Sequence, residues 1–219
     1  MRLDYKSTWN KLSADFDKAI RHVTGTATEK ELLQSGIHDA ERIIKHTQTT
    51  INDEVLEIGC GVGRIGLEYS NHCKTWTGAD ISSNMLEFAS QRLQHKENIN
   101  FKELTGCDLS IFEDNTFDVI YCSVVFMHLD EWDRYHYINE TYRVLNSRGR
   151  AYFDNFNLQS KEGWNTFMDH KEIPADNRPA HISKSSTKNE FEAYFKNSEF
   201  EKFVVITDGQ WVVGKGEKT

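Results

Sequence analysis

Residues 55–66 read VLEIGCGVGRIG, and the fold can be worked out from this stretch. It begins as a short apolar strand that contains an acid, Glu57, and continues with glycines at positions 59, 61, 63 and 66. Because glycine lacks a Cβ atom, such a loop can turn sharply from a strand into a helix. A ligand can then lie against its backbone N–H groups at the positive end of that helix. The pattern predicts a nucleotide-binding loop.

Strands and helices alternate after this loop. Periodicity and composition predict strands at 55–58, 75–79, 100–104, 117–126 and 150–156, with helices at 64–71, 82–93 and 130–145. The segment 117–126 is apolar almost throughout, which is typical of a strand buried on both faces of a parallel sheet. Asp130 is placed to cap the helix that follows it. The alternation predicts an α/β fold with a doubly wound, mostly parallel sheet.

The C-terminal segment breaks this alternation. A helix at 190–196 is followed by two predicted strands, at 200–207 and 210–216, with no helix between them. Asp208 and Gly209 join the two strands, and this dipeptide is a strong hairpin signal. The sheet is therefore expected to finish in an antiparallel C-terminal hairpin strand.

Length and composition bound the domain organisation and the partners. The chain has 219 residues, enough for one domain. We expect a helical N-terminal cap at 1–50, a core at 51–156, an insertion at 157–190, and a final helix and hairpin at 191–219. The formal net charge is −8 and no run of basic residues appears, so nucleic acid and anionic membranes are not expected partners.

Cysteine usage and the N-terminus bear on the compartment. The four cysteines form no C-x-x-C pair and are expected to be free thiols in a reducing environment. The first twelve residues lack the apolar core of a signal peptide, and no stretch of 18 apolar residues occurs. We expect a cytoplasmic protein that is not embedded in a membrane. The sequence leaves the oligomeric state open.

Two cofactor classes fit the glycine loop. Gly61, Gly63 and Gly66 satisfy the dinucleotide fingerprint, and Asp80 lies near the distance at which an acid would reach a ribose hydroxyl. Three features argue against a nicotinamide or flavin enzyme. Glu57 lies inside the strand, where it can order the loop; Asp108 follows the third predicted strand; and the closing hairpin is unusual for a dinucleotide fold.

Together these motifs resemble the class I S-adenosylmethionine-dependent methyltransferases that act on small molecules. The resemblance rests on Glu57 and the glycines in E-x-G-x-G-x-G, on Asp80, on Cys-Asp-Leu at 107–109, on the strand that begins FDVIYC, and on the hairpin. It covers residues 50–155 closely and the hairpin more loosely. It implies a seven-stranded sheet whose last strand is antiparallel, with S-adenosylmethionine lying across the carboxyl edges of the strands.

The resemblance also implies roles for individual residues. The glycines would face the methionine and ribose of the cofactor, Asp80 would bind both ribose hydroxyls, and Asp108 would hold the adenine amine. The complete cofactor-binding set that we expect is Glu57, Gly59, Gly61, Gly63, Arg64, Asp80, Ile81, Met85, Cys107, Asp108, Leu109, Ser123 and Val124. For Met85 and Leu109, ordinary core packing is the alternative interpretation.

Methyl transfer from a sulfonium needs positioning, and a hydroxyl acceptor also needs a group that takes its proton. His128 is the first candidate for this base, and Asp154 is a second. Packing without chemistry is the alternative for His128. The residues expected to bind the acceptor are Tyr5, Trp9, His128, Asn155, Trp164 and His181.

Asp130 and Asp154 also resemble the magnesium ligands of the catechol-type branch, but we expect no metal, since Asp130 is explained as a helix cap. The sequence therefore predicts methyl transfer to a small molecule, with an oxygen acceptor slightly favoured because of His128 and Asp154. A nitrogen acceptor, or a module that binds S-adenosylmethionine without turnover, is the alternative.

Overall fold

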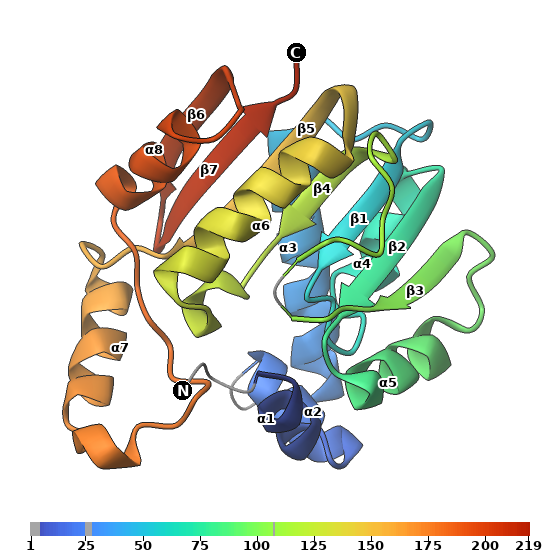
Figure 1. The fold of residues 1–219 in the computed structure, drawn as a ribbon. Helices are drawn as coiled ribbons and strands as arrows, with labels where there is room; N and C mark the ends of the chain where they lie inside the picture. Colours follow the sequence, from blue (N-terminus) through green and yellow to red (C-terminus); the bar gives the residue numbers. More distant parts are fainter. Residues whose placement is uncertain (1–4, 25–27, 107) are drawn as a thin grey trace.

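Seven strands form one sheet in the order β3-β2-β1-β4-β5-β7-β6 (Figure 1). The computed structural model describes residues 5–24, 28–106 and 108–219. The strands are β1 (Glu54–Ile58), β2 (Thr75–Asp80), β3 (Ile99–Glu103), β4 (Phe117–Cys122), β5 (Leu145–Phe156), β6 (Lys202–Asp208) and β7 (Trp211–Glu217). Strands β1 to β5 pair in parallel, and β7 is antiparallel to both β5 and β6. The predicted doubly wound sheet with an antiparallel C-terminal strand is confirmed.

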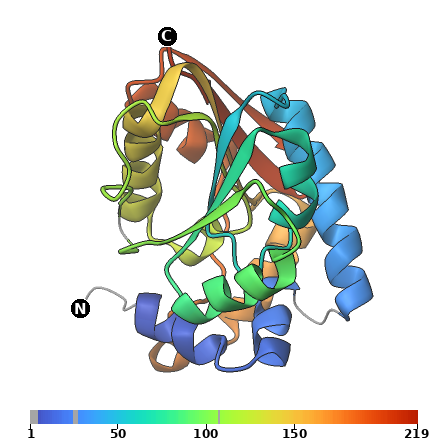
Figure 2. The same cartoon turned by 90° about the vertical axis from the view of Figure 1, so that its right-hand side faces the viewer.

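Helices cover both faces of the sheet, as the edge-on view in Figure 2 shows. The helices are α1 (Tyr5–Leu12), α2 (Phe16–Thr24), α3 (Glu29–Thr47), α4 (Gly66–Tyr69), α5 (Ser83–Leu93), α6 (Glu131–Val144), α7 (Lys161–Lys171) and α8 (Lys188–Lys196). Short 3₁₀ turns, η1 (Ser70–His72), η2 (Phe126–His128) and η3 (Ala175–Asn177), complete the described elements. None of the described helices is long and apolar enough to cross a membrane.

The alternation of side chains along each strand creates two cores. Leu56 and Ile58 of β1 lie in one core with Tyr137 of α6 and Phe191 of α8. Val55 faces the other side, in a core shared with α3 and α4. The central strands β1, β2 and β4 bury both of their faces, as the continuous apolar pattern of 117–126 indicated for β4.

Three predicted boundaries differ from the structure. The helix after β1 is short, spanning Gly66–Tyr69 and continuing only as the η1 turn. The β4 strand stops at Cys122, since Val124 takes a left-handed backbone conformation with φ +63°. The strand predicted at 150–156 begins earlier, at Leu145, and contains a bulge, because the β4–β5 register shifts between Phe117 and Val119.

The predicted N-terminal helical segment has two locations. Helices α1 and α2 lie beyond the edge of the sheet opposite the C-terminus (Figure 1), where the parallel strands end. Helix α3 instead packs on a sheet face, because Ala40 and Ile43 are buried in the core with Val55. Helix α3 therefore connects α1 and α2, which lie at the carboxyl ends of the strands, to the face of the sheet.

Candidate functional site

A cavity of about 540 Å³ lies at the carboxyl ends of β1, β2 and β4. The glycine loop and Asp80 form one wall, and residues that follow β4 form a second. Tyr5 and Trp9 of α1, together with His22 of α2, contribute a third wall. The cavity thus joins the predicted cofactor loop to the N-terminal helices.

Two glycines of the loop face this cavity in a conformation that other residues avoid. Gly59 and Gly61 have φ values of +75° and +52° and line the cavity. A Cβ atom on Gly59 would lie 2.3 Å from a methyl carbon of Val125, so the loop after β4 packs directly on the glycine loop. Gly63 does not line the cavity; its hydrogens face Leu93 of α5, so its role is packing.

Asp80 ends β2 and holds the glycine loop in place. Its Oδ2 accepts a hydrogen bond from the Gly61 N–H at 2.8 Å, and its Oδ1 accepts one from the Ser82 N–H at 2.9 Å. Burial raises the pKa of Asp80 to about 6, although these backbone donors act in the opposite direction. Asp80 lines the cavity, so its carboxylate is available to ligand hydroxyl groups.

Glu57 lies on β1 beneath the loop. The Tyr121 hydroxyl donates to Glu57 Oε2 at 2.6 Å and accepts a hydrogen bond from Trp76 Nε1 at 3.0 Å. Burial raises the pKa of Glu57 to about 8, partly offset by the Tyr121 hydrogen bond. Glu57 and Arg64 both line the cavity, and Arg64 Nη1 binds Asp39 at 2.6 Å.

The predicted adenine end is only partly assembled from the expected residues. Ile81 and Met85 line the cavity, and Leu104 and Gly106 line it where Asp108 and Leu109 were expected. Leu109 is fully buried in the core, and Asp108 Oδ1 accepts hydrogen bonds from Ser110 and Thr105 in its own turn. Cys107 lies outside the described residues.

Ser123 and Val124 line the cavity where β4 ends, but Asp154 is not placed as a base. The Asp154 side chain is fully buried and accepts hydrogen bonds from Ser123 Oγ (2.6 Å), Val124 N (2.8 Å), the Tyr152 hydroxyl (3.0 Å) and Arg42 Nη2 (3.1 Å). A carboxylate that already accepts four hydrogen bonds has a structural role and is not free to accept a proton from a ligand. The expectation that Asp154 takes the acceptor's proton is therefore corrected.

Two expected acceptor contacts also lie elsewhere. Asn155 points to the opposite sheet face, where its Nδ2 donates to Lys184 O at 3.1 Å and to Ser186 Oγ at 2.7 Å. It is fully buried and anchors the chain segment before α8. Trp164 is half exposed on α7, stacked on Phe167, and does not line the cavity. Both are corrections to the acceptor-binding set.

Asp130 precedes α6 without capping it through its side chain, which instead forms an ion pair with Lys184. Its position in the sequence correctly marked the start of the helix. Its carboxylate is engaged with the segment before α8, and Asp154 is engaged with Arg42. The two carboxylates that suggested a magnesium site each face a cation of the chain.

His128 lines the cavity in a defined tautomer. Its Nδ1 lies 2.8 Å from the His181 carbonyl oxygen, and because a carbonyl only accepts, Nδ1 carries the proton. Nε2 therefore bears the lone pair of the neutral ring. Burial lowers the pKa of His128 to about 4, so the ring stays neutral at physiological pH.

The aromatic residues of α1 surround this histidine. Trp9 packs edge-on against His128, with ring centroids 5.0 Å apart, and contacts His181 at 6.3 Å. The Tyr5 hydroxyl accepts a hydrogen bond from the Asp130 N–H at 3.1 Å, which holds α1 near the start of α6. His181 does not line the cavity itself and contacts the side chains that do.

Several further lining residues were not identified from the sequence, among them His22, Asp39, Phe156, Gln210 and Trp211. Phe156 and Trp211 stack with ring centroids 4.8 Å apart, so the C-terminal hairpin contributes an aromatic wall. The hairpin was predicted, but its approach to the cavity depends on strand order. Asp39 could have been found from the sequence, because Asp39, Arg42 and His46 are polar residues spaced to lie on one side of α3.

Comparison with known proteins agrees with this geometry. The family described as "Methyltransferase domain" matches residues 56–153. The uncharacterized methyltransferase YcgJ of Bacillus subtilis is 30% identical over 159 residues, which is 72% of this chain and 60% of the relative. A phosphoethanolamine N-methyltransferase of Plasmodium falciparum is 26% identical over 140 residues, 62% of this chain and 51% of the relative. The chain thus spans between half and two thirds of the length of these relatives.

Solved structures share the fold. The crystal structure of YcgJ superposes with a TM-score of 0.64 at 21% identity and covers 83% of this chain and 98% of the other. Magnesium protoporphyrin IX methyltransferase from Synechocystis, solved with bound S-adenosylhomocysteine (SAH), gives a TM-score of 0.69 at 13% identity and covers 98% of each chain. At these identities the likeness concerns the fold alone.

Proposed function

We propose that the chain, as a member of the class I S-adenosylmethionine-dependent methyltransferases, transfers a methyl group from this cofactor to a small molecule. The observation that carries the proposal is the continuity of one cavity. Asp80 and the glycine loop line it at one end, and the neutral His128 and the aromatic residues of α1 line it at the other. Donor and acceptor would meet beside Ser123 and Val124.

The chain's residues fit the cofactor. The bare backbone of Gly59 and Gly61 leaves room where a Cβ atom would collide or strain the chain. Asp80 presents a buried carboxylate for two ribose hydroxyls, and Ile81 and Met85 offer apolar contacts for adenine. Arg64 and Glu57 are polar groups for the amino-acid end of the cofactor.

S-adenosylmethionine, when bound, supplies a sulfonium methyl group, whose carbon–sulfur bond breaks as a bond to the acceptor forms. The cavity walls would orient the acceptor and exclude water, which is the main requirement for such a displacement. His128 Nε2 would accept a hydrogen bond from the acceptor's O–H or N–H and take its proton as the new bond forms. The low pKa of His128 keeps this nitrogen unprotonated before the reaction.

The acceptor that suits this cavity is small and largely apolar. The stacked pair of Phe156 and Trp211, together with Trp9 and Tyr5, provides flat apolar surfaces that match a ring-shaped molecule. Because Asp154 holds the loop after β4, only His128 favours an oxygen acceptor. A nitrogen acceptor is the alternative. Among the relatives, a demethylmenaquinone methyltransferase of Tropheryma whipplei is named for a quinone.

Charge and thiols support the remaining parts of the proposal. A net charge of −8 disfavours nucleic acid as an acceptor. Cys60, Cys73 and Cys122 are buried free thiols, which suits a reducing cytoplasm.

The test is methyl transfer itself, with His128→Gln as the informative variant. The protein is incubated with S-adenosylmethionine and panels of phenols, hydroquinones and amines, and the SAH formed is quantified. We expect turnover of hydroxyl acceptors by the wild type and a loss of about 100-fold in kcat for His128→Gln, the lower end of general base catalysis. The matched control is His95→Gln, which makes the same substitution at an exposed histidine.

Unchanged turnover in His128→Gln would remove the base role while leaving the methyltransferase in place. Tight SAH binding with no methyl transfer to any acceptor would instead favour a binding module without turnover.

A further inference from the structure

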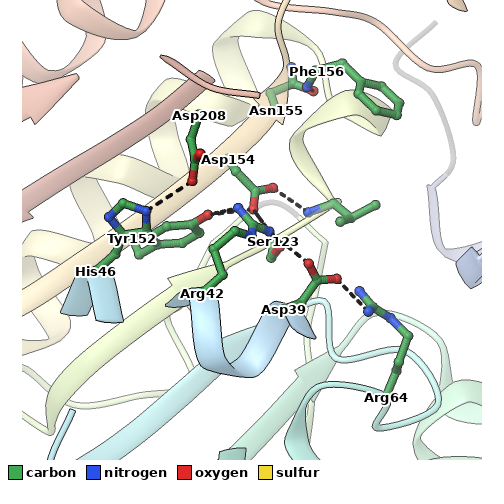
Figure 3. Close-up of polar contacts among 11 residues, drawn as sticks. Asp39, Arg42, His46, Arg64, Ser123, Tyr152, Asp154, Asn155, Phe156 and Asp208 are labelled. Carbon is green, nitrogen blue, oxygen red and sulfur yellow. Dashed lines mark hydrogen bonds and ion pairs between the residues drawn. The ribbon is translucent and has the colours of Figure 1, made fainter. Parts of the chain in front are cut away.

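Three polar side chains lie on one side of α3, and the first of them, Asp39, lines the cavity. Asp39, Arg42 and His46 are spaced at i, i+3 and i+7, and we call them the α3 ladder. Figure 3 shows them pointing from the helix towards the ends of the strands. Asp39 binds Arg64 of the glycine loop, and His46 Nε2 lies 3.4 Å from Asp208 at the end of β6.

Arg42 is the central member of the ladder. Its Nη2 lies 3.1 Å from Asp154 Oδ2 and 3.2 Å from Asp39 Oδ1, and its Nη1 donates to the Tyr152 hydroxyl. Its side chain is only 10% exposed. Burial works against its charge, yet Asp154, Tyr152 and Asp39 raise the pKa of Arg42 above its ordinary value. Arg42 is therefore a buried cation shared by two carboxylates.

One of these carboxylates fixes the loop after β4. Asp154 Oδ1 accepts the Val124 N–H at 2.8 Å, and Val124 has φ +63°, a conformation that is strained for a β-branched residue. Ser123 Oγ donates to the same carboxylate at 2.6 Å. The next residue, Val125, packs on Gly59. A partly buried hydrogen bond thus holds a strained loop against the glycine loop.

The other carboxylate fixes the glycine loop. Asp39 Oδ2 accepts from Arg64 Nη1 at 2.6 Å, and both side chains line the cavity. A continuous path then runs from Arg64 through Asp39, Arg42 and Asp154 to Val124, as the dashed lines in Figure 3 trace. It connects the glycine loop to the loop that follows β4.

We propose that Arg42 is a positioning residue that couples cofactor binding at the glycine loop to the order of residues 123–128 beside the acceptor. Without Arg42, Asp154 would be a buried carboxylate with no cation, which favours displacement of its side chain. Val124 would then lose the partner that holds its strained conformation. Asp39 would no longer link Arg64 to this loop. The inference rests on the proposed function, because it requires that SAH or S-adenosylmethionine binds the glycine loop.

The test measures whether SAH binding at the glycine loop also slows hydrogen exchange in the loop that follows β4. Hydrogen exchange is followed by mass spectrometry with and without saturating SAH, whose binding is first established by calorimetry. In the wild type we expect SAH to slow exchange in residues 57–66 and also in residues 123–129. In Arg42→Met we expect slowing in 57–66 to persist and slowing in 123–129 to fall by about tenfold or more.

Three further variants separate coupling from a general loss of stability. Arg150→Met removes another partly buried ion pair, between Arg150 and Asp53, whose arginine lies on β5 four residues before Asp154. In Arg150→Met, SAH should slow exchange in both loops as it does in the wild type. Arg42→Lys keeps the charge but replaces the planar fork with one ammonium group, so its coupling should be intermediate. If Arg42→Met does not fold, the double variant Arg42→Met, Asp154→Asn relieves the unpaired charge and should fold without coupling.

The kinetic readout separates positioning from cofactor binding. On any acceptor that the wild type turns over, Arg42→Met should lose about tenfold or more in kcat while the SAH Kd changes by less than about threefold. SAH-dependent slowing of both loops in Arg42→Met would overturn the coupling and leave the proposed function standing. Failure of the wild type to bind SAH would overturn the proposed function and the coupling together.

Discussion

Asp80 combines two demands in one side chain. It orders the glycine loop through the Gly61 and Ser82 N–H groups, and it also faces the cavity. Burial raises its pKa to about 6, within two units of physiological pH. Only the charged form offers acceptors to both ribose hydroxyls, so ligand binding and protonation of Asp80 compete.

This competition predicts a pH dependence of SAH binding. Because the deprotonated carboxylate binds, the contribution of Asp80 to affinity should be complete above pH 7 and should weaken as the pH falls through 6. Below that point the Kd should rise about tenfold per pH unit, as for one competing proton. Asp80→Asn should raise the Kd at pH 7.5 by about 10- to 100-fold, the loss of a charge-assisted pair of hydrogen bonds.

Calorimetric titrations from pH 5 to 8 provide the measurement, and Asp17→Asn on an exposed part of α2 provides the control. An Asp80→Asn variant with the same pH profile as the wild type would show that another group controls binding.

Residues of the site differ in how far the sequence could reveal them. Asp80, Gly59 and Gly61 were identified because the loop they form is local, with strand, glycines and acid at fixed spacing. Asp154 was misread as a base because its partner Arg42 lies 112 positions away in the sequence. Nothing near Asp154 in the sequence tells that a helix before the sheet supplies its cation.

At the scale of elements, α3 does more than the predicted cap would. Gly36 lets this helix approach the glycine loop, since a Cβ atom there would lie 2.3 Å from the Arg64 backbone oxygen. Ala40 and Ile43 bury the next turns against the sheet. The same contact that packs α3 on the sheet thus brings Asp39 and Arg42 to the site.

Gly36→Ala tests this packing because two effects oppose each other. Alanine favours a helix interior over glycine by about 1 kcal/mol. A Cβ atom against a backbone oxygen cannot be relieved by a rotamer change, and overpacking of this kind costs about 1–3 kcal/mol. We expect the clash to dominate, so that urea unfolding shows a lower stability and SAH binds more weakly.

Gln34→Ala, at an exposed position of the same helix, is the control and should leave both quantities unchanged or raise stability slightly. A Gly36→Ala variant more stable than the wild type, with unchanged SAH affinity, would mean that α3 can move away from the glycine loop without consequence.

The elements themselves were largely predictable, and their contacts were not. Binary patterns along the chain gave the strands and most helices, because each pattern reflects burial within one element. The hairpin at Asp208 and Gly209 was also local. That its Trp211 stacks on Phe156 and lines the cavity depends on β7 pairing with β5, which no local pattern encodes.

At the scale of the molecule, the order of the strands creates the site. The chain reverses its winding direction between β1 and β4, and the ends of both strands open into the cavity. In open α/β sheets such a switch point is where ligands bind. Helices α1 and α2 add aromatic side chains above it, so a single cavity can hold a nucleoside and a second small molecule together.

The central claim is that this cavity binds the methyl donor, although the glycine pattern also matches a dinucleotide site. The most direct test is isothermal titration of the wild-type chain with SAH and, separately, with NAD⁺. We predict saturable binding of one SAH per chain and no heat of binding for NAD⁺. Saturable binding of NAD⁺ without binding of SAH would contradict the assignment of the cavity.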